Sequence, residues 1–191
     1  MEPQSTTIVV DVIPQRPWPE TLKALSSLLE LSWGQFTLVF VVYEWPSQRQ
    51  RIVTSLQQKL HDWTLVSVSL QDPALDLRNL SGRFFETLRE IAQRQSPSYD
   101  AVLLLDWEQR LAPDQPPERQ PSTSLVGVFN VGRHLLEKTF ACPVVVLVPQ
   151  TAMRVLMQLA PGFVSWQSGA FFVPYDKPAL EAELRAAVTE V

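Results

Sequence analysis

The stretch Phe36–Tyr43 reads FTLVFVVY and decides the fold class. Its residues are apolar on both faces of an extended chain, and most are β-branched or aromatic. This pattern is typical of a strand buried between two layers of helices, as in parallel sheets. Two further stretches have the same character, DAVLLLD at Asp100–Asp106 and PVVVLV at Pro143–Val148. We therefore expect three central strands.

Helical patterns separate these strands along the chain. Helices of this length form crossover connections, so the strands pair in parallel with right-handed crossovers. The sequence predicts an α/β fold with three α-β-α layers around a mainly parallel sheet, similar to P-loop NTPases. We expect an extended N-terminal arm over residues 1–19, with Thr7–Ile13 as an edge strand or arm, and a single domain over 20–191. The remaining expected elements are helices over 20–31, 47–61, 79–94, 122–139, 151–159 and 178–189, strands over 63–70 and 169–173, and a loop over 109–121.

The composition excludes several classes of protein. The chain has 191 residues, of which 46% are hydrophobic and 19% charged, and a net charge of −4. A core of this size argues against disorder, and the absence of a basic field argues against duplex nucleic acid as a partner. The single cysteine, Cys142, excludes an internal disulfide, and we expect it to be buried and inert. With neither a signal peptide nor a membrane-spanning stretch, we expect a cytoplasmic protein.

The turn after the first central strand, Tyr43–Arg51 (YEWPSQRQR), lacks the features of a phosphate-binding loop. Such a loop uses glycines to direct backbone N–H groups at phosphates, and a lysine to reach the terminal ones. Here neither glycine nor lysine is present, and Glu44, Trp45 and Pro46 occupy the turn. We expect a strand-to-helix turn closed by a capping box of Ser47 and Gln50, without tight triphosphate binding.

Acidic side chains follow the next central strand, in AVLLLDWE at Ala101–Glu108. In an NTPase, Asp106 would hold magnesium through water and Glu108 would polarise the attacking water. The alternative is that both acids cap or salt-bridge the end of a buried strand. A third hypothesis is a metal- or acid-base-dependent enzyme that uses Asp106, Glu108 and His134. The sequence offers neither a second cluster of metal ligands nor a set of nucleophile and base residues. We therefore assign no catalytic residue and no metal site.

Asn130 and Arg133 are neighbours on the helix predicted over 122–139. They could contact a nucleotide or an acidic peptide, or form a solvated flank beside the apolar stripe of that helix. We assign Asp106, Glu108, Asn130 and Arg133 as the candidate nucleotide-binding set.

Several segments in order resemble the inactive, STAND-like NTPase domains of bacterial multidomain proteins. The segments are Leu22–Val42, Pro46–Leu60, Ala101–Glu108, Phe129–Leu136 and Pro143–Phe172. The motifs that carry the resemblance within them are Phe129, Asn130 and Arg133 on a helix, Val146–Pro149 at a strand end, and APGFVSWQSG at Ala160–Gly169. The chain departs from the last motif at Gly162, Val164 and Gln167, which replace an acid, a tryptophan and an arginine. The resemblance implies a non-catalytic regulatory or scaffolding module of signalling or defence proteins, without a cofactor, whose partner is another protein or an adjoining domain. The alternative is a nucleotide-binding switch that does not hydrolyse.

The tryptophans suggest where a partner would bind. We expect the domain to expose Trp18, which lies between two prolines, and also Trp45 and Trp107, which each follow a buried strand, and Trp166. If those strands are adjacent, the two rings converge over the carboxyl edge of the sheet, either as interface anchors or as plugs that fill a vacated nucleotide pocket. We assign Trp45, Trp107, Trp166 and Gln167 to the interaction surface.

Overall fold

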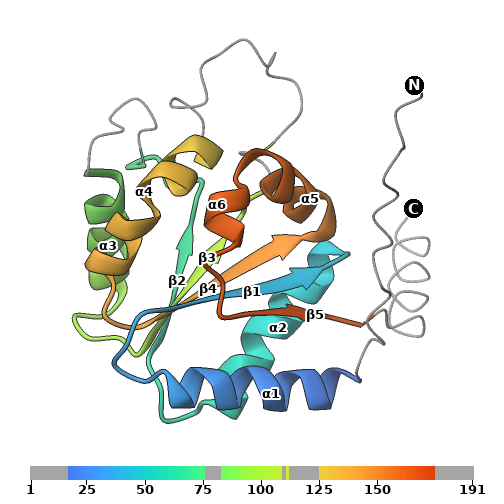
Figure 1. Cartoon of the computed structure of the whole chain (residues 1–191). Coiled ribbons are helices and arrows are strands. Elements are labelled where there is room, and N and C mark those ends of the chain that lie inside the picture. Colours follow the sequence, from blue (N-terminus) through green and yellow to red (C-terminus); the bar gives the residue numbers. More distant parts are fainter. Residues whose placement is uncertain (1–16, 76–82, 109–110, 112–124, 175–191) are drawn as a thin grey trace, which may run out of the picture.

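A computed structural model describes residues 17–75, 83–108, 111 and 125–174. Five strands and six helices lie in these ranges, and a helix separates each strand from the next, with two helices, α5 and α6, before the last strand (Figure 1). In order they are α1 (Trp18–Leu31), β1 (Thr37–Tyr43), α2 (Pro46–Lys59), β2 (Leu65–Ser69), α3 (Arg83–Gln95), β3 (Ala101–Leu105), α4 (Leu125–Thr139), β4 (Pro143–Pro149), α5 (Gln150–Leu159), α6 (Pro161–Val164) and β5 (Gly169–Phe172).

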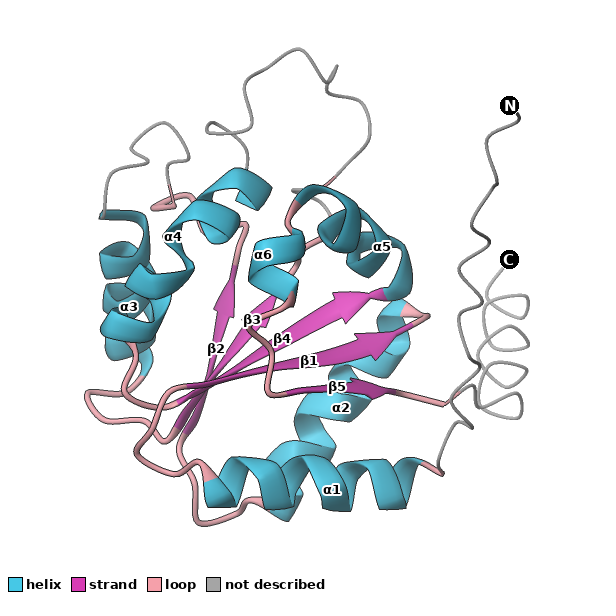
Figure 2. Cartoon of the chain, viewed as in Figure 1, coloured by secondary structure: helices cyan, strands magenta, loops and turns pink. Residues whose placement is uncertain are grey.

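The strands form one parallel sheet in the order β2-β3-β4-β1-β5, a topology of the Rossmann and P-loop kind (Figure 2). Strands β1 and β4 lie side by side in register from Thr37 opposite Pro143 to Tyr43 opposite Pro149. Every residue of both strands is buried. The strands that the sequence predicts to be central are therefore β1, β3 and β4.

The direction of each crossover decides which face of the sheet each helix covers. The chain moves one way across the sheet from β1 to β2, and the opposite way from β2 to β3, from β3 to β4 and from β4 to β5. Because crossovers are right-handed, the first connecting helix must lie on the opposite face from the others. Accordingly, α1 and α2 pack under one face, while α3, α4, α5 and α6 cover the other (Figure 1). Among the described helices, none has the length and apolar character needed to cross a membrane.

Two details at the N-terminal side differ from the sequence prediction. Helix α1 begins at Trp18, so the expected arm over 1–19 overlaps the folded domain. Trp18 is buried, and its indole Nε1 lies 3.4 Å from the hydroxyl of Ser55 in α2, so the expectation that this ring is exposed is wrong. Gly34 ends the α1 turn with φ 70°, a conformation that favours glycine. The predicted segments 7–13, 112–121 and 178–189 lie outside the described residues.

Candidate functional site at the carboxyl edge of the sheet

The strand order places a topological switch point between β1 and β4. The chain leaves these two adjacent strands toward opposite faces of the sheet, through α2 and α5 respectively. In open α/β sheets, ligands bind in the crevice beyond the carboxyl ends of such strands. The turn from β1 into α2 and the residues after β3 border this region, and they carry the charged side chains described next.

The amide groups of the β1–α2 turn are held by a side chain of the turn itself. Oε1 of Gln48 accepts hydrogen bonds from the backbone N–H groups of Glu44 (2.9 Å) and Trp45 (3.0 Å). Nε2 of Gln48 donates to the backbone oxygen of Pro174 at 3.2 Å, and the side chain is buried. Pro46, the first helical residue, has no N–H to offer. The predicted Ser47–Gln50 capping box is therefore wrong, because Trp45 is the N-cap and Gln48 is the third helical residue.

Asp106 is anchored on both carboxylate oxygens. Arg49, on the first turn of α2, donates to Oδ1, and the hydroxyl of Ser69 at the end of β2 donates to Oδ2. The backbone of Asp106 has φ 64°, a left-handed conformation in which aspartate is one of the few tolerated side chains. This conformation turns the chain sharply at the end of β3 and directs the carboxylate toward α2 and β2.

Glu108 shares the same guanidinium. Its Oε1 lies 3.5 Å from Nη1 of Arg49, while its buried Oε2 has no hydrogen-bond partner within the described ranges. Two carboxylates thus surround one guanidinium, which leaves a formal charge of −1 at this edge. A cationic side chain near a helix N-terminus is unfavourable, because that end of the helix dipole is positive. Attraction to the two carboxylates offsets this repulsion for Arg49.

Tyr43, the last residue of β1, lies beside these charges. It is 1% exposed, and its hydroxyl lacks a hydrogen-bond partner among the residues that the structure describes. Burial raises the pKa of the phenol well above its ordinary value of 10, and the carboxylates of Glu108 and Asp106 raise it further, while Arg49 acts in the opposite direction. The phenol is therefore a neutral group under a charged cluster.

This arrangement satisfies Asp106 but leaves Glu108 only partly paired. Arg49 and Ser69 engage both carboxylate oxygens of Asp106, whereas Oε2 of Glu108 has no hydrogen-bond partner within the described ranges. Within the described ranges, no group of three or more His, Cys, Asp or Glu side chains could hold a metal ion. His134, named in the metal or acid-base enzyme hypothesis, is exposed on α4.

The other two residues of the candidate nucleotide-binding set form a separate cluster between α4 and α6. Oδ1 of Asn130 accepts from the backbone N–H of Phe163 at 3.1 Å. Nη1 of Arg133 donates to the backbone oxygen of Asn130 at 2.8 Å, and its Cζ lies 5.4 Å from the centroid of the Trp166 ring. The bond from Phe163 fastens α6 to α4, and Arg133 contacts the segment that follows α6. None of the contacts described for Asn130 and Arg133 involves Asp106 or Glu108.

Gly162 lies against this second cluster. A Cβ there would lie 2.8 Å from Oδ1 of Asn130 and 2.9 Å from Nη1 of Arg133. The glycine, one of the departures from the family motif, therefore allows α6 to approach the polar face of α4.

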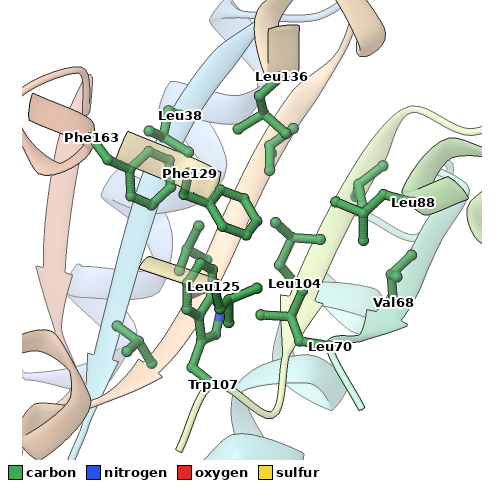
Figure 3. Close-up of a cluster of buried hydrophobic side chains, with 14 of the residues drawn as sticks. Leu38, Val68, Leu70, Leu88, Leu104, Trp107, Leu125, Phe129, Leu136 and Phe163 are labelled. Atoms are coloured by element: carbon green, nitrogen blue, oxygen red, sulfur yellow. The ribbon is translucent and has the colours of Figure 1, made fainter. Parts of the chain in front are cut away.

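The four residues assigned to the interaction surface have different environments. Trp107 is 0% exposed and lies in the core under α4 and α6, with its ring centroid 4.8 Å from that of Phe129 (Figure 3). Its strand β3 is separated from β1 by β4, so Trp107 and Trp45 do not follow adjacent strands, and the condition for the two rings to converge is not met. A buried Trp107 cannot be a surface anchor in this fold. It fills the core, whereas the plug alternative places both rings in a vacated nucleotide pocket and Trp45 is exposed.

Trp45, by contrast, is 43% exposed. Trp166 is partly buried, and the neighbouring Gln167 has a buried Oε1 without a partner in the described part of the chain. The role of these three residues in binding a partner stays a prediction.

Cys142 is buried at the start of β4, as expected. Burial, with a smaller contribution from Asp100, raises the pKa of its thiol from 9.0 to about 12. The thiol is therefore protonated and unreactive at neutral pH.

Sequence reasoning missed Arg49, Gln48 and Ser69, the residues that close the edge. Arg49 alone carried a detectable signal, because a basic residue in the first turn of a helix opposes the helix dipole and implies nearby acids. Ser69 and Gln48 become informative only once the strand order and the turn are known.

Comparison with known proteins does not place the chain in a family. Neither a scan against protein-family models nor a search of curated proteins finds a match.

Proposed function

We propose that this chain is a non-catalytic interaction and regulatory module, built on a degenerate P-loop-NTPase-like fold of the kind found in prokaryotic signalling and defence proteins. The observation that carries the proposal is the occupation of the switch-point edge by the protein's own side chains. Gln48 takes up the turn amides that would face phosphates, and Arg49 pairs with Asp106 and lies 3.5 Å from Glu108.

The occupation of both parts of the site has a chemical consequence. Phosphate binding at a strand-to-helix turn needs free backbone donors, and magnesium needs carboxylates with available oxygens. Asp106 has both oxygens engaged, and Glu44 and Trp45 have both amides engaged. A nucleotide would have to displace Gln48 and Arg49 before it gained any of these contacts.

A ligand panel tests the proposal directly. With ATP, ADP, GTP or cyclic nucleotides at millimolar concentration plus Mg²⁺, we expect an unchanged melting temperature and no hydrolysis above the blank. A ligand that binds only the folded state would raise the melting temperature. A saturable rise would favour the alternative of a nucleotide-binding switch, and turnover that Asp106→Asn abolishes would overturn the proposal altogether.

The contribution of Arg49 is measured by a double-mutant cycle. Arg49→Met and Asp106→Asn should each destabilise the protein, and their coupling energy should be on the order of 1 kcal/mol, since the pair is partly exposed and screened by solvent. Arg154→Met, an exposed arginine on α5, is the matched control and should show no coupling to Asp106→Asn. A coupling near zero for Arg49 would show that this side chain does not hold the acids in solution.

A further inference from the structure

The opposite, amino edge of the sheet carries a hollow of about 220 Å³ beside the first residues of β1. It is lined by Phe36, Thr37, Leu38, Glu137, Trp166 and Ser168. Its walls come from β1, from the last turn of α4 and from the segment joining α6 to β5, which the backbone hydrogen bond from Ser168 N–H to the oxygen of Leu38 (2.8 Å) fixes to the strand. All of these segments belong to the described part of the chain.

The lining combines two aromatic side chains with one carboxylate. Phe36 and Trp166 are partly buried, and Glu137 is exposed. Aromatic faces attract cations through the ring quadrupole, and a neighbouring carboxylate adds direct charge attraction. Because Arg133 already lies over the Trp166 ring, the attraction for a further ammonium or guanidinium group comes from Phe36 and from the carboxylate of Glu137.

The carboxylate of Glu137 is available because its natural partner is engaged elsewhere. Arg133 lies one helical turn before Glu137, where a charge pair would ordinarily form. Instead, Arg133 bonds to the backbone oxygen of Asn130 and lies over the ring of Trp166. No basic side chain of the described ranges lies within ion-pair distance of Glu137, and Arg133 does not line the hollow.

We propose that this hollow receives a lysine or arginine side chain presented by a partner protein. A volume of about 220 Å³ is below the roughly 300–1,000 Å³ of sites that enclose a small molecule, but it suits a single side chain that enters from a protein surface. The inference takes up the interaction role proposed above and gives it a chemical preference. It does not depend on whether the carboxyl edge binds a nucleotide.

The test uses short peptides as probes, with NMR as the readout. We would titrate the full chain with acetyl-Gly-Lys-Gly-amide and its arginine counterpart, and follow the indole N–H of Trp166, assigned with Trp166→Phe, and the amide of Ser168. Both resonances should shift saturably at millimolar peptide. The norleucine peptide, which keeps an aliphatic stem without the charge, should bind at least about five-fold more weakly.

Glu137→Gln supplies the matched protein variant. It should weaken the binding of the lysine peptide about two- to five-fold, the range expected for one exposed charge pair, without changing the melting temperature. Glu90→Gln, an exposed acid on α3, should leave peptide binding unchanged. A similar loss in both variants would show that only the net charge matters, and would overturn the proposal.

The remaining outcomes also decide the matter. The absence of any shift with either basic peptide, or equal binding of the norleucine peptide, would overturn the inference. Free methylammonium that binds as tightly as the lysine peptide would assign the hollow to a small cation and refute a protein partner. A nucleotide-induced melting shift in the earlier panel would refute the proposed function while leaving this result intact.

Discussion

Replacing Trp107 by alanine separates the core role of this ring from a surface role. Trp107 is fully buried, 4.8 Å from the ring of Phe129 and 6.2 Å from that of Phe163 between centroids. Phe163 in turn lies 5.5 Å from Phe40 of β1, so Trp107 joins an aromatic cluster that links the sheet to α4 and α6. Trp107→Ala would remove the largest side chain of this cluster and leave a cavity.

The expected loss is about 3–5 kcal/mol, the range for truncating a buried tryptophan or phenylalanine to alanine. Domains of this size lose about 2–4 °C of melting temperature per kcal/mol, so the melting temperature should fall by roughly 6–20 °C. Urea denaturation followed by circular dichroism measures the free energy of unfolding. Trp107→Phe should cost far less, because it keeps an aromatic ring and removes an indole N–H that has no partner within the described ranges.

Trp45→Ala is the matched control, since Trp45 also follows a buried strand but is 43% exposed. It should change the free energy of unfolding by less than about 1 kcal/mol. Equal losses in the two alanine variants, or a loss below about 1 kcal/mol in Trp107→Ala, would refute the assignment of Trp107 to the core.

Three further predictions concern single positions. Asp106→Gly should be more stable than Asp106→Ala by about 1 kcal/mol in urea denaturation. Both variants lose the carboxylate, but only alanine is strained in the left-handed backbone conformation. Equal stability of the two variants would contradict a φ of 64° at this position. Gly132→Ala should lower the free energy of unfolding by about 1–2 kcal/mol, although alanine has the better helix propensity. The reason is that its Cβ would collide with the buried ring of Phe85. A stabilised variant would refute that contact. Because burial raises the pKa of Tyr43, the stability that its neutral phenol contributes should be complete below about pH 10 and lost as the pH rises above that value. Tyr43→Phe should therefore show a smaller fall in unfolding free energy than the wild type above about pH 10, and identical falls would contradict this account.

The central strands could be predicted because a strand that is buried on both faces consists of a short run of apolar residues, which can be recognised in the sequence. FTLVFVVY and PVVVLV contain no polar residue after the opening threonine of β1, and both strands are buried throughout. Strand order is not encoded in this way. The pattern of apolar residues is the same whether β3 lies next to β1 or beyond β4, so whether Trp45 and Trp107 follow adjacent strands could be stated only as a condition.

The same limitation explains what was missed at the site. Asp106 and Glu108 could be identified because acids directly follow a buried strand. Their partners come from separate segments, Arg49 from α2 and Ser69 from β2. Which side chains converge at an edge depends on the strand order and on the sharp turn at Asp106, and neither can be derived from spacing alone.

The two edges of the sheet differ in how completely they satisfy their own polar groups. At the carboxyl edge, the turn amides and the carboxylate of Asp106 are bonded within the protein, while Oε2 of Glu108 and the hydroxyl of Tyr43 have no partner in the described ranges. At the amino edge, Glu137 has no basic partner in the described ranges, and Trp33 is 66% exposed although its indole N–H donates to Asp100 at 3.1 Å. An aromatic ring fixed by a hydrogen bond loses little side-chain entropy when it is covered, which favours its use in recognition. The partner protein proposed above could therefore cover Trp33 at little cost in side-chain entropy.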